Sequence, residues 1–279
     1  MAGEHTIKAS KDGGYMFSET LCVVGSHGDN RQLDFVNRNV ALVNPAVCQL
    51  YAVHDEGRNN SQFVTISLDG QHTLNELGAM YPGYDIEAIA IDPGTNLIYA
   101  VSGEDATQVE QGMMFQLDGK TGELAPVGST HFGDIEDMVF SPDGNILWAW
   151  IKGEGLATLD PITGLGTLVF RSDWQVEGLT LIENQQGHLV FYGTVGQELW
   201  VYNSHTGLLP TAPSCSNLPG ETEALESWNG SLVIGVHDDK TFSLHVYNQT
   251  CQMEESLGIP TGQYNDIEAI GLPIDACTR

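Results

Sequence analysis

Basic residues are scarce in this chain. Its 279 residues include 10 Lys and Arg against 37 Asp and Glu, which gives a formal net charge of −27. A surface of that sign repels the phosphate backbone of nucleic acids and the headgroups of anionic lipids, so we expect neither as a partner. Cations and basic partners are the natural complements of such a charge, although acidity also serves solubility alone.

Long hydrophobic runs are also missing. No stretch approaches the ~18 apolar residues of a membrane-spanning helix, so no membrane span is expected. Residues 1–5 and those that follow contain no apolar segment typical of a signal peptide. Either the protein is cytoplasmic, or the sequence is the mature form of an extracellular or periplasmic protein with an added initiator Met.

Cysteine is rare, and its spacing indicates no metal or redox motif. The five cysteines include no CxxC pair, which argues against zinc ribbons and thioredoxin-like chemistry. Their odd number leaves at least one thiol free in a monomer, and Cys48 and Cys277, at equivalent turns, are interpreted as packing residues. The chain also lacks a GxSxG elbow, a P-loop, an HExxH motif and an EF-hand loop.

What the chain does contain is a short phrase around a glutamate, repeated five times. The separations between successive glutamates are 49, 41, 46 and 45 residues. A period in the forties is typical of β-propellers, in which each blade has four antiparallel strands. The central glutamates are Glu87, Glu136, Glu177, Glu223 and Glu268.

The same order of features follows each phrase. A turn leads to a run of β-branched and aromatic residues, such as residues 97–101 and 146–150, which is typical of a buried strand. Later, residues 118–122 and 160–164 have the pattern Asp-x-x-Thr-Gly. This pattern predicts a hairpin in which the Asp side chain bonds local amides and Gly takes a positive φ. An earlier unit lacks the glutamate, and residues 39–45 are its expected inner strand.

These features predict an all-β protein, a single six-bladed β-propeller over residues 1–279. The expected blades lie at about residues 39–84, 85–133, 134–174, 175–220 and 221–265. The sixth joins residues 266–279 to residues 1–38, because pairing the N- and C-terminal strands removes exposed sheet edges. A five-bladed propeller with an N-terminal extension is the alternative.

The repeated glutamates are the candidate site. The phrase opens the innermost strand of each blade, so the five side chains are expected to form a ring at one mouth of the central channel. Asp85, Asp134 and Asp266, two residues earlier, widen this ring, and Asn39 offers a neutral oxygen at the sixth place. Converging carboxylates repel one another. Three features can relieve this repulsion: a bound Ca²⁺, hydrogen bonds from amides of the neighbouring blade, or protonation.

The loops after the second strands are expected at the same mouth and are also acidic. Two of them contain the same step, His54-Asp55 and His237-Asp238. A paired His and Asp binds a transition metal or acts as an acid and base, whereas a solvated polar loop is the simpler interpretation. Ligands generally bind at loops of this kind.

The phrase at residues 85–89, with the Asp-Pro-x-x-Asn-x-Ile-Tyr-Ala-Val segment at residues 92–101, resembles bacterial propellers of the phytase-esterase-like and SdiA-regulated groups. The resemblance implies an extracytoplasmic, calcium-associated propeller, in a group where few members have hydrolase activity. The Asp-rich signature of β-propeller phytases is absent from this chain. The positions that match the motif are Asp85, Glu87, Asp134, Glu136, Asp266 and Glu268, while Glu177 and Glu223 lack the leading Asp.

Two functional hypotheses follow. The leading one is a non-catalytic, secreted or surface-associated propeller that binds Ca²⁺ at the channel mouth and offers its acidic loops to a protein or glycan partner. The alternative is a metal-dependent hydrolase of phosphoesters, esters or lactones. In that case the axial glutamates hold the metal, and His54 or His237 is the general base.

Overall fold

The computed structural model describes residues 5–10, 16–21, 48–68, 72–206, 210–238, 241–257, 264 and 266–273. The chain divides into two units, residues 1–38 and 39–279. The first unit contains an antiparallel hairpin of β1 (His5–Ser10) and β2 (Met16–Leu21). In the described ranges no helix is long and apolar enough to cross a membrane.

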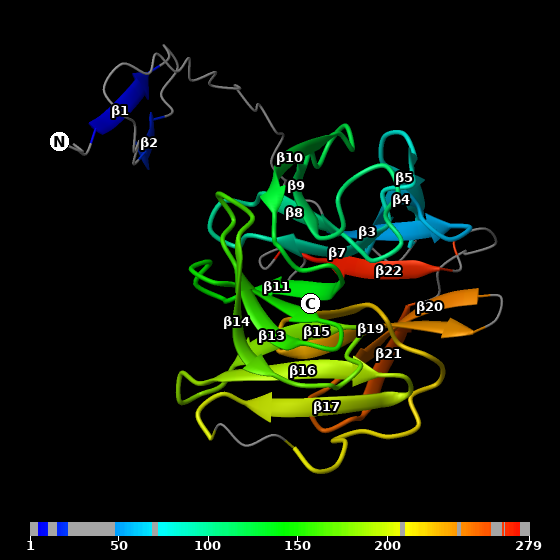
Figure 1. The fold of residues 1–279 in the computed structure, drawn as a ribbon. Coiled ribbons are helices and arrows are strands. Elements are labelled where there is room, and N and C mark those ends of the chain that lie inside the picture. The colour runs from blue at the N-terminus through cyan, green and yellow to red at the C-terminus, as the bar shows by residue number, and fades with distance from the viewer. Residues whose placement is uncertain are drawn as a thin grey trace. The chain divides into compact units, whose positions relative to one another are not determined.

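The described strands of the second unit form five antiparallel sheets, which we number blades 1 to 5 (Figure 1). Blade 1 contains β22 (Ile267–Gly271), β3 (Gln49–Glu56), β4 (Asn60–Ser67) and β5 (Leu74–Glu76), with β6 (Tyr81–Pro82) also paired to β4. Blade 2 contains β7 (Ile86–Ile91), β8 (Ile98–Ser102), β9 (Met113–Leu117) and β10 (Leu124–Ser129). Blade 3 contains β11 (Ile135–Phe140), β12 (Leu147–Ile151), β13 (Gly155–Leu159) and β14 (Gly166–Arg171). Blade 4 contains β15 (Leu179–Glu183), β16 (Leu189–Val195) and β17 (Glu198–Asn203), and blade 5 contains β18 (Leu225–Trp228), β19 (Ser231–Asp238), β20 (Thr241–Tyr247) and β21 (Met253–Leu257).

The inner strand of blade 1 comes from the far end of the chain. β22, red in Figure 1, pairs with β3, so the last phrase completes the first blade. The prediction of six blades is therefore wrong, and the alternative of five blades is correct. β1 and β2 pair only with each other among the described strands. Asn39 and the inner strand expected at residues 39–45 lie outside the described residues, and β22 occupies the inner edge of blade 1.

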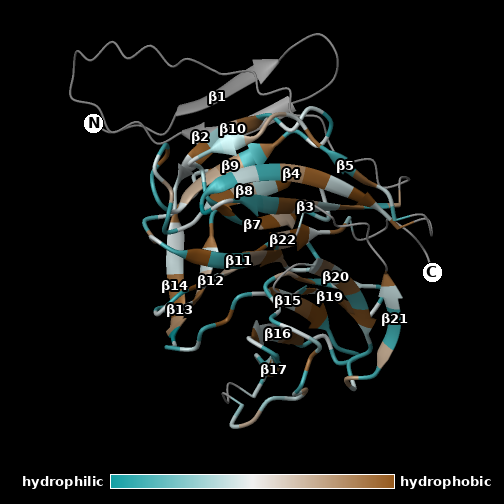
Figure 2. Ribbon diagram, turned by 90° about the vertical axis from the view of Figure 1, so that its right-hand side faces the viewer, coloured by the Kyte–Doolittle hydropathy of each residue, from teal (hydrophilic) through white to brown (hydrophobic). Residues whose placement is uncertain are grey.

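Buried apolar clusters join each blade to the next. The innermost strands contact one another in the order β7, β11, β15, β18, β22 and back to β7, which closes the ring. Among the described residues, five clusters fill the five interfaces, and the one with Leu50 and Phe242 joins blade 5 to blade 1. Inner strands covered on both faces are mostly apolar, as on β7, where every residue except Glu87 is apolar (Figure 2). The outer strand β14 instead alternates half-buried and exposed residues.

The hairpins have the predicted turn chemistry. Asp118 Oδ1 accepts the amides two and three residues later, at 2.9 and 2.8 Å, and Gly122 has a φ of +73°. Asp160 Oδ1 makes the same pair of contacts at 2.8 and 3.4 Å, and Gly164 has a φ of +85°. These turns join β9 to β10 and β13 to β14, so the repeated pattern identifies the outer hairpins of blades 2 and 3.

Blade 4 has three described strands where four were expected. The outer edge of β17 meets Cys215 through an isolated bridge to Leu199. Cys215 also forms a disulfide with Cys251, which lies between β20 and β21, with the Cα atoms 5.6 Å apart. This bond ties the open edge of blade 4 to blade 5. Cys48 is disulfide-bonded as well, so its interpretation as a packing residue is wrong.

Candidate metal centre

Three of the five phrase glutamates lie on β-bulges at the start of an inner strand. The pairing of β7 with β8, β11 with β12 and β22 with β3 shifts by one residue at Glu87, Glu136 and Glu268. A bulge inserts an unpaired residue and redirects its side chain. Glu177 and Glu223 lie just before β15 and β18, at the corresponding ends of blades 4 and 5. All five glutamates therefore enter the ring of inner strands from the same end.

Burial and mutual repulsion raise the pKa values of these glutamates. Burial is the largest cause in every case, and neighbouring carboxylates add to it. The pKa of Glu136 rises to about 7, while the pKa values of Glu87 and Glu268 lie well above the usual range. Among the neighbouring charges, Glu87 raises the pKa of Glu268 most, which indicates that carboxylates of blades 1 and 2 face a common space.

Lys152 neutralises charge in blade 3. Its Nζ lies 2.8 Å from Glu136 Oε1, and 3.7 Å from both Asp134 Oδ2 and Glu104 Oε1. Burial lowers the pKa of Lys152, but the hydrogen bond and charges of these carboxylates raise it above its usual value. Lys152 is therefore a fixed cation at the mouth, and it comes from one of the loops that the sequence placed there.

Glu177 has a different partner. Burial raises its pKa, and a backbone amide of Gly196, in the turn between β16 and β17, lowers it. The donor belongs to the same blade. Among the described residues, no ring glutamate accepts a hydrogen bond from a backbone amide of a neighbouring blade, so the structure gives no support to that one of the three predicted ways to relieve the repulsion.

Other acidic residues connect the blades instead, and the sequence analysis missed them. Asp137, a neighbour of the ring, accepts the Leu179 amide of blade 4 at 2.7 Å. Glu226 on β18 accepts the Thr180 hydroxyl of blade 4 at 3.2 Å and an amide of Leu272, which follows β22. The sequence does mark Asp137, because the other four phrases have Ala or Gly at that position. Nothing in the repeat marks Glu226.

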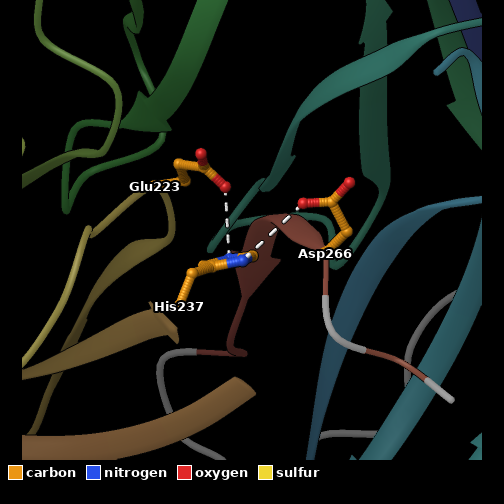
Figure 3. Close-up of side chains that lie close together, drawn as sticks. All are labelled: Glu223, His237 and Asp266. Carbon is orange, nitrogen blue, oxygen red and sulfur yellow. Dashed lines mark ion pairs between the residues drawn. The ribbon is translucent and has the colours of Figure 1, made fainter. Parts of the chain in front are cut away.

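Glu223 and Asp266 converge on His237 (Figure 3). His237 Nε2 lies 3.2 Å from Glu223 Oε2, and Nδ1 lies 3.7 Å from Asp266 Oδ1. One potential ligand atom from each of the three side chains lies within 4.8 Å of the others. Among the described residues this is the one group of His, Cys, Asp or Glu that meets this criterion. The two carboxylates that contact His237 come from other segments of the chain.

His54 occupies the equivalent place in blade 1 but has different neighbours. Its Nδ1 donates to the backbone oxygen of Asp266 at 2.8 Å. In the described residues it makes no ion pair with a carboxylate. The two histidines that look alike in the sequence therefore differ in the structure, and His237 alone faces two acidic side chains.

Asp55 is a further buried carboxylate of this group. It is 5% exposed, and its Oδ1 has no hydrogen-bond partner. Burial raises its pKa to about 7, the Ser61 hydroxyl opposes this, and Asp85 and Asp266 add repulsion. Asp55 in turn raises the pKa of Glu87, so it belongs to the same charged space.

Glu87 and Glu268 also lack a counter-charge among the described residues. The effects on their pKa values are burial and the charges of other carboxylates, all of which raise them. Asp85 is partly compensated, because it accepts the Asp105 amide at 2.6 Å, yet burial holds its pKa at about 6. Glu87 packs against Gly103, where a Cβ atom would overlap its side chain.

An apolar pocket lies elsewhere, between blades 3 and 4. Its walls include Trp150, Trp174, Trp200 and Tyr202, and no ring carboxylate contributes to it. The pocket and the carboxylate ring are therefore separate features.

No family model matches this chain, and no curated protein matches it. A chain of the crystal structure of a nidogen/laminin complex is similar in fold, with a TM-score of 0.54 and 10% identity over 82% of this chain and 99% of that chain. A structural genomics protein of unknown function from Bacteroides thetaiotaomicron is less similar, with a TM-score of 0.49 and 13% identity over 67% of this chain and 53% of that chain. The first likeness supports the β-propeller fold alone, and membership of the phytase-esterase-like or SdiA-regulated groups stays a prediction.

Proposed function

We propose that this propeller is a non-catalytic binding module that holds Ca²⁺ between blades 1 and 2 and presents its acidic loops to a partner. The observation that carries the proposal is the set formed by Glu87, Glu268 and Asp55. These three carboxylates repel one another, no cation among the described residues neutralises them, and the one donor seen is the Ser61 hydroxyl at Asp55. Ca²⁺ takes 6–8 oxygen ligands at roughly 2.3–2.6 Å, which suits clustered carboxylates and backbone oxygens.

The remaining ring carboxylates already have other partners, so they are less suited to bind this ion. Lys152 already pairs with Glu136 and Asp134, and Glu177 accepts an amide. Glu223 and Asp266 face a histidine, as described above. The proposed Ca²⁺ ligands are therefore only the carboxylates between blades 1 and 2, which are Glu87, Glu268 and Asp55, with Asp85 beside them.

A protein or glycan partner with basic groups suits the charge of the loops. Opposite charge speeds association and makes it dependent on salt. The similar fold of a chain in a nidogen/laminin complex agrees with assembly with another protein. An oxidising, extracytoplasmic location is supported by the Cys215–Cys251 disulfide, because disulfides persist mainly in such compartments.

Thermal unfolding in chelator and in excess Ca²⁺ tests the binding proposal. A ligand that binds only the folded state at 100 times its Kd stabilises it by about 2.7 kcal/mol. We expect wild type and Glu177→Gln to gain this stability with Ca²⁺, and Glu87→Gln/Glu268→Gln to gain none. Equal midpoints in chelator and Ca²⁺ for the wild type would remove the ion from the proposal.

Metal-dependent hydrolysis is the second candidate, and the contact of His237 with two carboxylates favours it. The substrates to test are a phosphomonoester, an ester and a lactone, each with several divalent metals. Turnover that is lost in His237→Gln and retained in His54→Gln would support an enzyme. No turnover across the panel would leave binding as the function.

A further inference from the structure

The three residues around His237 connect two blades. Glu223 precedes β18 and His237 lies on β19, both in blade 5, whereas Asp266 directly precedes β22 of blade 1. The backbone holds this geometry, because the His237 amide donates to the Glu221 carbonyl at 2.8 Å. The imidazole is largely enclosed, with 10% of its side chain exposed.

The contacts of the imidazole indicate which nitrogen has a free lone pair. Nε2 lies 3.0 Å from the Ile267 carbonyl oxygen in hydrogen-bond geometry, and a carbonyl can only accept, so Nε2 carries a hydrogen. In the neutral ring, Nδ1 then presents a lone pair toward Asp266 Oδ1 at 3.7 Å. Two lone pairs that face each other need a positive charge between them, either a proton or a metal ion.

The contacts of Nε2 resemble those of metal-bound histidines. A histidine that binds a metal through one nitrogen usually donates the other N–H to a carboxylate or backbone carbonyl, which orients the ring. The Ile267 carbonyl does this here. Glu223 Oε2 is buried and lies 3.2 Å from Nε2, yet it has no hydrogen-bond partner.

We infer that Glu223, His237 and Asp266 form a second cation site, for a divalent transition-metal ion such as Zn²⁺ or Co²⁺, separate from the Ca²⁺ site. One imidazole nitrogen with two carboxylate oxygens is a ligand set of this class, whereas Ca²⁺ takes oxygen ligands only. The potential ligand atoms lie within 4.8 Å of one another, so side-chain movements are needed to reach metal–ligand distances of about 2.0–2.2 Å. The largest movement is that of Glu223, because its carboxylate now lies beside Nε2 and has to turn toward an ion on Nδ1. The ion would bridge blade 5 to blade 1, at the interface that β22 closes.

A cobalt titration of the tag-free, full-length protein in excess Ca²⁺ tests this inference. Co²⁺ bound through nitrogen and oxygen ligands gives visible ligand-field bands that the free aqua ion has only weakly. We expect these bands to saturate at one equivalent and to disappear when Zn²⁺ is added. Since Ca²⁺ is present throughout, occupancy of the proposed Ca²⁺ site does not affect the result.

The matched control is the equivalent histidine of blade 1. His54→Gln should retain the bands, whereas His237→Gln and Asp266→Asn should lose them, with folding checked by circular dichroism. Glu87→Gln should retain them, which separates this site from the one under Proposed function. The absence of bands in the wild type, or their persistence in folded His237→Gln, would overturn the inference.

Discussion

The substitution Asp55→Asn should change the pH dependence of stability in the metal-free protein. Asp55 is buried, its pKa rises from 3.8 to about 7 on folding, and Oδ1 has no partner. Between these two pH values the folded state binds more protons than the unfolded state, so stability falls as pH rises. Asparagine has a similar shape and does not titrate, so the stability of the variant should not fall with rising pH for this reason.

The magnitude follows from the shift of about three pKa units at ~1.36 kcal/mol each, which is about 4 kcal/mol. In chelator, the stability of Asp55→Asn relative to wild type should therefore improve by about 4 kcal/mol from pH 4 to pH 8. For a unit of this size that corresponds to roughly 8–16 °C in midpoint. Comparing the two pH values removes any constant effect of the substitution.

Thermal unfolding followed by circular dichroism at five pH values between 4 and 8 measures this difference. In saturating Ca²⁺ at pH 8 the wild type should be the more stable protein, because it binds the ion and the variant has lost a ligand carboxylate. A stability difference that stays constant from pH 4 to pH 8 in chelator would refute the assignment of Asp55 as a buried carboxylate without a counter-charge.

Three other substitutions follow from named contacts. Cys215→Ser/Cys251→Ser should lose about 4 kcal/mol by urea unfolding, because the bond closes a loop with a sequence separation of 36, and a loss below 1 kcal/mol would contradict this role. Asp137→Ala leaves the buried Leu179 amide of blade 4 without an acceptor and should lower the free energy of unfolding by about 1–3 kcal/mol in the same assay. An unchanged free energy of unfolding would show that Asp137 does not hold blades 3 and 4 together. Gly103→Ala should reduce the Ca²⁺-dependent shift in thermal midpoint, because the new methyl overlaps Glu87, and an unchanged shift would place the ion elsewhere.

Much of the blade was predictable from local patterns. The apolar runs at residues 97–101 and 146–150 correspond to β8 and β12, and the Asp-x-x-Thr-Gly turns form as expected. These features depend on nearby residues only. The number of blades depends on pairing between β22 and β3, which are distant in sequence, and a mean period applied to the whole chain counted residues 1–38 as part of a blade.

The candidate site was predictable in outline and not in detail. The repeat placed the glutamates at the start of the inner strands, as observed for Glu87, Glu136 and Glu268. Which of them has a counter-charge depends on loops from different parts of the chain, such as the one with Lys152. His237 meets Asp266 across a blade interface, a contact that no sequence spacing indicates.

An anomalous difference map from crystals of the full chain, with a lanthanide in place of Ca²⁺, tests the central proposal most directly. The account predicts a peak within about 2.3–2.6 Å of carboxylate oxygens of Glu87 and Glu268, with Asp55 beside it. The same crystals of Glu87→Gln/Glu268→Gln should show no peak there. A wild-type map without a peak between blades 1 and 2 at saturating lanthanide would contradict the account.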